Sequence, residues 1–142
     1  MSTEQQGPPR QAIFDIDAII ERFPATADTM MCDTRMTDEA EASCRVFRVY
    51  KPVPAHFHAT CHEYLYVLRG RGTFAMADMA PFPIAAGQLL FFKKGTVHSL
   101  AATEDPLVFL AIDTPRRDPS DVNFVNPNDG TPATFMGTKK LY

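Results

Sequence analysis

The sequence predicts an all-β domain with a short N-terminal helix and an extended C-terminal arm. From about residue 42 to residue 113, short apolar runs are interrupted by Gly, Pro or Asp every eight to twelve residues, which is typical of a β-sandwich or β-barrel. After Asp113 the chain becomes rich in Pro, Asn, Asp and Gly, a composition that favours extended, irregular structure. A length of 142 residues suffices for one domain with one buried core.

The N-terminal region divides into a leader and a helix. Residues 1–11 are polar and contain a Gly-Pro-Pro run, so we expect a flexible leader with too few apolar groups to order itself. Apolar residues then recur at helical spacing, with Asp15 as the N-cap and Pro24 as the stop. The residues of this pattern are Ile16, Ile19, Ile20 and Phe23.

Residues 12–113 are predicted to form the barrel domain. We expect strands near residues 42–50, 53–58, 63–69, 72–78, 88–93, 97–102 and 106–113, with one or two more between residues 26 and 38. The sequence Gly70-Arg71-Gly72 predicts a tight hairpin between two of them, and Met79-Ala80-Pro81 predicts another turn. Neighbouring strands are therefore expected to be antiparallel.

Residues 114–142 are predicted to form an arm that packs on the barrel or on a partner subunit. Its isolated apolar anchors are Val122, Phe124, Val125 and Phe135. Two interpretations are open for the charged group Arg116, Arg117 and Asp118: these residues bind a ligand carboxylate, or they hold the arm in place. The second interpretation is favoured.

Composition excludes several classes of function. With 14 basic and 17 acidic residues the net charge is −3, and no dense Lys/Arg stripe is present, so we expect no nucleic-acid partner. No signal peptide and no run of about 20 apolar residues is found, which predicts a cytoplasmic protein without a membrane partner. The three cysteines lack CxxC spacing, so we expect free thiols.

One stretch, "PAHFHATCHEYLYVLRG", holds three of the chain's four histidines. His56 and His58 are two residues apart, so both leave the same face of a strand. Glu63 shares a strand face with Leu65, which predicts that it points inward. A buried carboxylate needs a partner, since leaving it unpaired costs several kcal/mol or raises its pKa. Two histidines and a cation supply that partner.

The fourth histidine, His98, follows an apolar strand and a turn at residues 93–95. A hairpin at this turn places His98 opposite the first pair of histidines. We therefore predict one divalent transition metal per chain, with open positions for water or substrate. Fe, Mn, Co, Ni, Cu and Zn all suit three imidazoles and a carboxylate. The predicted ligands are His56, His58, Glu63 and His98.

The spacing of these residues resembles the two signature motifs of the cupin superfamily. The first motif is matched by His56, His58, Glu63 and Gly70, and the second by Gly87, Gly95 and His98. The resemblance covers roughly residues 40–113 and implies a jelly-roll barrel, a double-stranded β-helix of the germin and RmlC type, that binds metal at those four ligand positions. The chain departs from the motifs at Tyr50, Lys93 and Ala102, which are not ligand positions.

The predicted function is that of a mononuclear non-haem metal-dependent oxygenase, with iron as the favoured metal. Its substrate is expected to be a small, largely apolar or aromatic molecule, because the predicted core is rich in aromatic and methionine side chains. Two alternatives stay open: a metal-dependent isomerase, epimerase or lyase, and a cupin that binds a metabolite without turnover. The aromatic and methionine residues in question are Phe47, Phe74, Met76, Phe91, Phe92 and Phe109.

Other residues have minor or open roles. Tyr64, Tyr66 and Leu68 form an outward apolar stripe, which predicts a homodimer of the kind that cupins commonly form, with cover by the C-terminal arm as the alternative. His62 has the opposite strand parity to Glu63, so we expect it at the surface or hydrogen-bonded to that carboxylate. Cys61 is expected to be unreactive, and Lys93 is expected to be a solvated turn residue.

Overall fold

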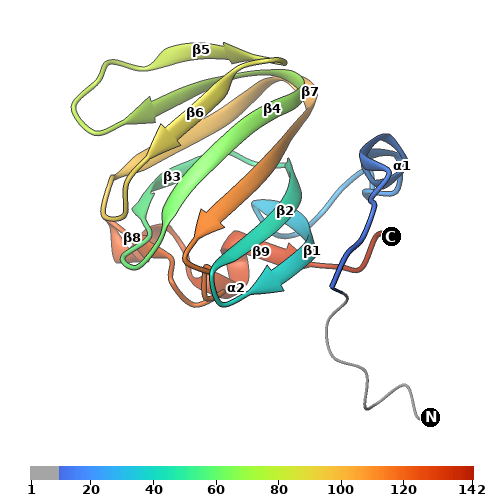
Figure 1. The fold of residues 1–142 in the computed structure, drawn as a ribbon. Coiled ribbons are helices and arrows are strands. Elements are labelled where there is room, and N and C mark those ends of the chain that lie inside the picture. Colours follow the sequence, from blue (N-terminus) through green and yellow to red (C-terminus); the bar gives the residue numbers. More distant parts are fainter. Residues whose placement is uncertain (1–9) are drawn as a thin grey trace.

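A computed structural model of the chain describes residues 10–142; the predicted leader lies almost entirely outside this range. Figure 1 shows strands wrapped into a barrel, with one helix beside it and the C-terminal segment beneath it. The helices are α1 (Ile16–Glu21) and α2 (Pro132–Phe135), with a 3₁₀ turn over Pro127–Asp129. The strands are β1 (Met31–Glu39), β2 (Ala42–Val49), β3 (Val53–Phe57), β4 (His62–Met76), β5 (Phe82–Ala85), β6 (Leu89–Phe92), β7 (His98–Thr114), β8 (Asn123–Phe124) and β9 (Met136–Thr138).

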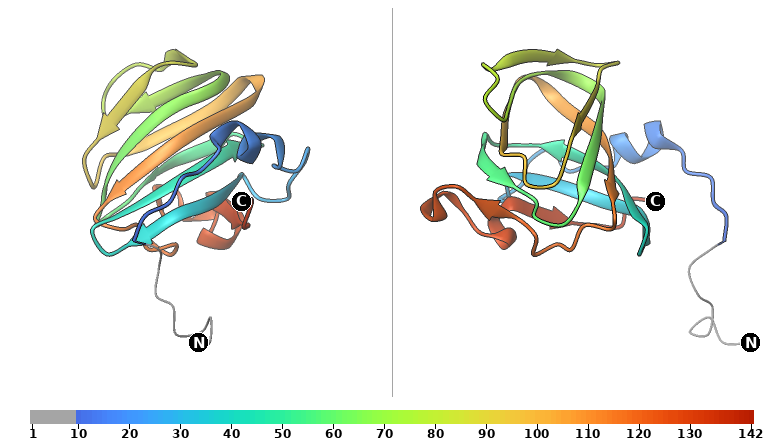
Figure 2. Two further views of the ribbon diagram at one scale, coloured as in Figure 1. Left: turned by 45° about the vertical axis from the view of Figure 1, so that its right-hand side comes forward. Right: turned by 60° about the vertical axis from the view of Figure 1, so that its left-hand side comes forward.

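Two long strands organise the barrel. Strands β4 and β7 contain 15 and 17 residues and pair antiparallel along their lengths. The first half of β4 pairs with β6 and its second half with β5, while the two halves of β7 pair with β3 and β2. Each long strand therefore takes part in both layers of the sandwich (Figure 2). This is the double-stranded β-helix, or jelly roll, that the sequence predicts.

The long strands correct two sequence predictions. The strands predicted at residues 63–69 and 72–78 are parts of the single strand β4, which ends at Met76, and those predicted at residues 97–102 and 106–113 are parts of the single strand β7, which begins at His98. The predicted hairpin at Gly70 is wrong: its φ of 84° introduces a register shift that bends β4 and does not reverse it. The turn at residues 79–81 does join antiparallel strands, β4 and β5. The predicted β6–β7 hairpin is also wrong, because β6 pairs with β4 while the start of β7 pairs with β3.

Gly70 is expected to be the glycine most sensitive to substitution. A Cβ atom at this position would overlap the carbonyl oxygen of Pro106, in addition to the strain of the positive φ. We expect Gly70→Ala to lower the free energy of unfolding by about 2 to 4 kcal/mol. Gly95 has a similar φ of 82° with open space around its Cβ position, so Gly95→Ala should cost only about 1 kcal/mol. Urea unfolding of both variants checks this, and equal losses would contradict it.

The N-terminal helix forms as the sequence predicts. Asp15 caps α1 by accepting a hydrogen bond from the backbone N–H of Ala18 at 3.1 Å. Ile19 is buried in a second apolar cluster, which lies between α1 and the outer face of the barrel. Leu68 packs against this cluster too, so it is not part of an exposed stripe with the two tyrosines. No helix within residues 10–142 is long and apolar enough to cross a membrane.

The C-terminal arm packs on the barrel. Strand β9 pairs in parallel with β1, and β8 pairs with β3, so the arm closes one end of the barrel (Figure 2, right). Val122 and Phe135 are buried in the interior core and act as the predicted anchors. Val125 is 59% exposed, so that anchor prediction is wrong. Its backbone N–H bonds to Ala55 while its side chain faces outward.

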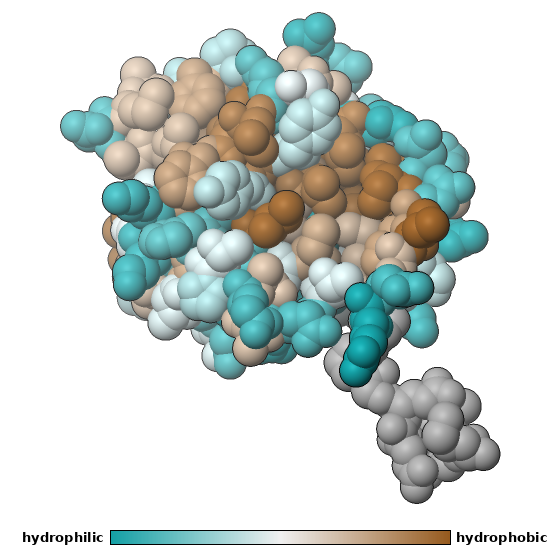
Figure 3. Space-filling model, in the orientation of Figure 1, coloured by the Kyte–Doolittle hydropathy of each residue, from teal (hydrophilic) through white to brown (hydrophobic). Residues whose placement is uncertain are grey.

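An apolar face remains on the outside of β4, β6 and β7. On this face Tyr64 is paired with both Phe91 and Ile112, and all three side chains are exposed. The next row places Tyr66 between Leu89 and Leu110. Figure 3 shows hydrophobic side chains gathered in this region with hydrophilic ones around them. Phe91, which the sequence assigned to the core, therefore lies at the surface, and the arm does not cover it.

Candidate metal centre

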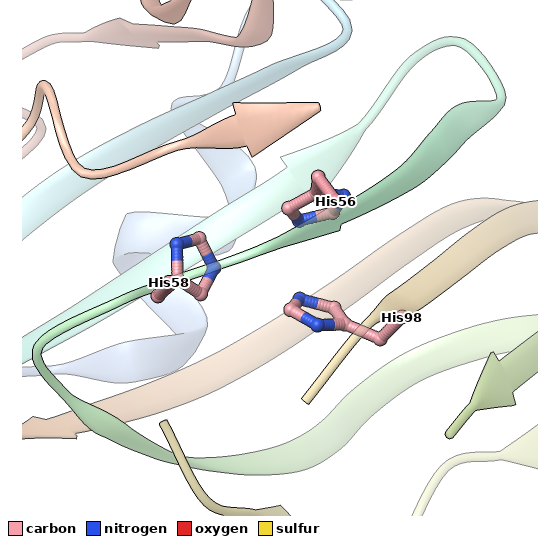
Figure 4. A group of neighbouring side chains, drawn as sticks. All are labelled: His56, His58 and His98. Atoms are coloured by element: carbon pink, nitrogen blue, oxygen red, sulfur yellow. The ribbon is translucent and has the colours of Figure 1, made fainter. Parts of the chain in front are cut away.

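Three imidazoles meet inside the barrel. His56 lies on β3, His58 directly follows that strand, and His98 is the first residue of β7. The β3–β7 pairing places His56 opposite His98. One ring nitrogen from each of the three residues lies within 4.8 Å of the others, and the rings point toward one another in Figure 4. This spacing suits one bound metal ion, as the sequence predicted for these three residues.

Hydrogen bonds fix the tautomer of each ring. Each Nδ1 lies at hydrogen-bond distance from a backbone carbonyl oxygen, which can only accept. Each Nδ1 therefore carries the hydrogen, and each Nε2 keeps a free lone pair. The acceptors are Pro54 for His56 at 2.8 Å, Asp121 for His58 at 2.7 Å and Thr96 for His98 at 2.9 Å.

Burial keeps the three imidazoles neutral. His56, His58 and His98 are each at most 3% exposed. Desolvation of the charged form is the main cause that lowers the pKa of each ring to about 3. Neutral, oriented Nε2 atoms are what a transition metal requires of histidine ligands.

Glu63 lies at the edge of this cluster. Its carboxyl group is buried, with Oε2 3.9 Å from Nε2 of His58 and 3.3 Å from Nη2 of Arg45. Burial, and then the neighbouring charge of Asp113, raises the pKa of Glu63 well above its ordinary value. The inward orientation that the sequence predicted is present. The role of Glu63 as a metal ligand stays a prediction.

A buried ion network supports Glu63, and sequence reasoning did not find it. The guanidinium of Arg45 donates to Asp113 at 2.8 and 3.1 Å, to Asp33 at 3.1 Å and to Glu63 at 3.3 Å. Because all three nitrogens of Arg45 are engaged, the network holds the Glu63 carboxyl in place. The available signal was strand parity: Arg45 lies two residues before the core residue Phe47 on β2, so both side chains point to the same inner face.

The two arginines of the arm have different environments. Arg116 donates to both carboxylate oxygens of Asp38, at 2.7 and 3.1 Å, and so ties the arm to β1 as the favoured reading expected. Arg117 is only 2% exposed. Its Nε lies 3.8 Å from Oδ1 of Asp113, and its guanidinium lies 5.7 Å from the centre of the Phe135 ring. Arg117 therefore lies in the interior and does not take part in the ion pair that attaches the arm to β1.

Two cavities meet at the arm. The inner one, about 20 Å³, is lined by the three histidines, Glu63 and apolar side chains. The outer one, about 350 Å³, opens between β1 and the arm. Arg117 and Met136 line both cavities. These two side chains therefore separate the histidine cluster from a space large enough for a small organic molecule.

The remaining candidates lie outside the cluster. Burial raises the pKa of the Cys61 thiol to about 12, so this cysteine is protonated and unreactive at neutral pH. Nδ1 of His62 accepts a hydrogen bond from the backbone N–H of Lys94 at 3.0 Å. His62 therefore stabilises the turn at residues 93–95 and is not hydrogen-bonded to Glu63. Lys93 is exposed in that turn, as expected.

Comparisons with known proteins agree with this fold. Residues 47–113 match the family model of the cupin domain, and a comparison with curated proteins gives no match. KdgF from Halomonas sp. aligns with a TM-score of 0.57 at 15% identity, covering 63% of this chain and 82% of its own. An uncharacterized protein with a double-stranded β-helix domain from Klebsiella pneumoniae aligns with a TM-score of 0.60 at 15% identity, covering 75% and 92%.

An RmlC-like cupin family protein from Methanocaldococcus jannaschii aligns with a TM-score of 0.56 at 13% identity, covering 77% of this chain and 94% of its own. At these identities the neighbours establish the fold alone. The family match over residues 47–113, the jelly-roll topology and these neighbours agree on a cupin-type fold.

The metal-free protein is expected to lose stability as the pH falls from about 6.5 to about 4.5. Between these values the three imidazoles take up protons in the unfolded chain, whereas their folded pKa of about 3 keeps them neutral. Glu63 has the opposite effect on stability. Because its pKa is raised in the folded protein, the folded state holds one proton that the unfolded chain has released. A net excess of about two protons in the unfolded state lowers stability by about 2 kcal/mol per pH unit.

Urea unfolding at pH 6.5 and pH 5.0, with a chelator present, measures this effect. A stability that stays constant or rises toward pH 5.0 would contradict the neutral state of the three rings.

Proposed function

We propose that the chain is a mononuclear metal-dependent enzyme whose ion is held by Nε2 of His56, His58 and His98. Two observations support this most strongly: one ring nitrogen from each buried histidine lies within 4.8 Å of the others, and the Nδ1 hydrogen bonds leave Nε2 of each ring with a free lone pair. Glu63 is the proposed fourth ligand, since its buried carboxyl group lies 3.9 Å from Nε2 of His58. Iron is the favoured metal of the several that suit this donor set.

The reaction we favour is the oxidation of a small organic substrate, which makes the chain an oxygenase. A bound redox-active ion supplies the capacity to activate dioxygen. The protein supplies a dry surrounding: Phe47, Leu65 and Phe135 line the inner cavity and exclude water from the ion's neighbourhood. The other acids near the cluster, Asp33 and Asp113, are already paired with Arg45, so neither is free to act as a general base.

One observation favours a second candidate, a metal-dependent isomerase or lyase. The 3.9 Å between Glu63 and His58 leaves the carboxyl outside the three-histidine group, and its raised pKa suits a proton donor or acceptor. In this reading Glu63 moves a proton on the substrate, and three histidines alone hold the ion. A cupin that binds a metabolite without turnover is the third possibility.

The variant Glu63→Gln separates the two catalytic readings. If Glu63 is a ligand, the variant should bind metal at least about 10-fold more weakly than the wild type, because an amide oxygen is a poorer donor. If Glu63 is an acid or base, metal content should stay near one ion per chain and turnover should fall. Elemental analysis by plasma mass spectrometry measures the metal, and Glu104→Gln, at an exposed site, is the control.

Oxygen consumption tests the oxygenase reading directly. Protein loaded anaerobically with Fe²⁺, Mn²⁺, Ni²⁺ or Cu²⁺ is mixed with catechols or β-diketones and exposed to air at an oxygen electrode. We expect uptake with at least one metal and substrate pair. The matched control is His98→Ala, which should show none. No uptake with any of these metals, together with intact metal binding, would favour the non-redox candidate.

We also propose that the apolar face of β4, β6 and β7 forms a homodimer. Six exposed or partly exposed apolar side chains in two adjacent rows are an unusual surface for a monomer, and a twofold axis lets the face pack on its own copy. Light scattering of the wild type should give twice the chain mass. The double variant Tyr64→Lys/Phe91→Lys should give the chain mass, and a wild-type monomer at 100 μM would refute the dimer.

A further inference from the structure

We propose that Arg117 is the binding residue for the carboxylate of an organic ligand that occupies the outer cavity. This inference deepens the proposed function, since it assigns the substrate class of the metal centre. The juxtaposition that supports it is a buried guanidinium with unused N–H groups, placed where the outer cavity meets the histidine cavity.

The hydrogen-bonding capacity of Arg117 is not satisfied within the described chain. Its Nε and Nη1 are buried and make no hydrogen bond. The nearest acid, Asp113, is 3.8 Å from Nε, which is too long for a hydrogen bond. Asp113 already accepts from Ser43 at 2.6 Å and twice from Arg45. A buried guanidinium left in this state is costly, so a ligand that accepts its hydrogen bonds gains affinity.

The backbone holds Arg117 in place for such a ligand. Its N–H donates to the hydroxyl of Ser43 at 3.2 Å, and its carbonyl oxygen accepts from Nη2 of Arg35 at 2.9 Å. The side chain is positioned as well, because its guanidinium lies over the Phe135 ring. Little ordering is therefore required on binding, and preorganisation of this kind favours affinity.

The outer cavity indicates the chemistry of the rest of the ligand. Its volume of about 350 Å³ suits a small organic molecule. Apolar side chains contribute much of its wall, and Arg35, which is paired with Asp38 at 3.0 Å, lies on the same wall. The acid on this wall, Asp33, already accepts hydrogen bonds from Arg45 and from the hydroxyl of Thr138. The apolar residues are Pro119, Pro132, Ala133 and Met136. The cavity therefore fits a compact apolar or aromatic monocarboxylate.

A carboxylate suits this site better than a neutral group does. Its two oxygens match the planar fork of a guanidinium, which forms charge-assisted bonds about twice as strong as neutral ones. With its carboxylate on Arg117, such a ligand has its apolar part in the outer cavity. There it lies beside Arg117 and Met136, the two side chains that separate this cavity from the histidine cluster. Arg117 is thus a specificity residue that selects acids.

The test measures benzoate against its neutral isostere benzamide by calorimetric titration of the metal-free protein. We expect benzoate to bind at least about 10-fold more tightly than benzamide. Arg117→Gln should remove this preference. Arg116→Gln should keep it, because Arg116 is the neighbouring arginine outside the cavity. Equal binding of the two probes, or a preference that survives in Arg117→Gln, would overturn the proposal.

A second measurement covers the case in which Arg117→Gln does not fold. In wild-type protein labelled with ¹⁵N-arginine, benzoate should shift the side-chain Nε–H resonance of Arg117, assigned from the Arg117→Lys spectrum, and benzamide should not. An unshifted resonance at saturating benzoate refutes the assignment. Metal content is measured separately: intact metal binding without a carboxylate preference rejects this inference alone, and the reverse result rejects the metal centre alone.

Discussion

Replacing His98 by alanine is expected to leave a folded barrel that binds metal at least about 100-fold more weakly than the wild type. His98 supplies one of three Nε2 donors, and the two remaining donors both come from the β3 region. Losing the only donor from β7 leaves the ion without a ligand on that side, which lowers affinity far more than loss of a supporting residue does. Plasma mass spectrometry after dialysis against one equivalent of Zn²⁺ measures the effect.

The control for this prediction is His62→Ala, which removes the one histidine that lies outside the cluster. This variant should retain wild-type metal content. Circular dichroism of both variants checks that the barrel is folded. Full metal occupancy in a folded His98→Ala protein would mean that the ligand assignment is wrong.

Replacing Arg45 by methionine is expected to cost about 3 to 5 kcal/mol of folding free energy. The substitution keeps much of the side-chain volume but leaves the carboxylates of Asp33 and Asp113 buried without their cation. For a domain of this size the melting temperature should fall by about 10 to 17 °C. Thermal unfolding followed by circular dichroism measures the loss.

A control for Arg45 lies on the same strand. Arg48 faces the other side of β2 and donates to the carbonyl oxygen of Pro24 at 3.3 Å, with no acid as a partner. We expect Arg48→Met to cost no more than about 1 kcal/mol. Adding Asp113→Asn to Arg45→Met should recover part of the loss, because it removes one stranded charge. Equal losses for the two arginine variants would contradict the network.

Local sequence signals were sufficient for much of the fold. The Asp15 cap and the spacing of Ile16 and Ile19 defined α1 because helix signals act within a few residues. The strands β2, β3 and β6 were found from short apolar runs for the same reason. The bend in β4 was not found, because a glycine at positive φ serves equally in a hairpin and in a bulge. Only the pairing of the distant partner strand decides between the two.

The candidate site shows the same division between local and long-range information. The spacing of His56 and His58, and the parity of Glu63, predicted inward side chains correctly, since the period of a strand is two residues. Arg45 and Arg117 were missed as interior residues because a charged side chain is rarely buried unless distant partners neutralise it. For Arg45 those partners come from β1, β4 and β7. No local pattern specifies them.

X-ray absorption spectroscopy of protein loaded with one equivalent of Zn²⁺ measures the ligands of the three-histidine centre. We expect a first shell of nitrogen and oxygen donors at about 2.0 to 2.2 Å, with outer-shell scattering from three imidazole rings. In His98→Ala the same spectrum should show no more than two rings. A wild-type spectrum without imidazole scattering, or one that requires a sulfur donor such as Cys61, would contradict a metal centre built from His56, His58 and His98.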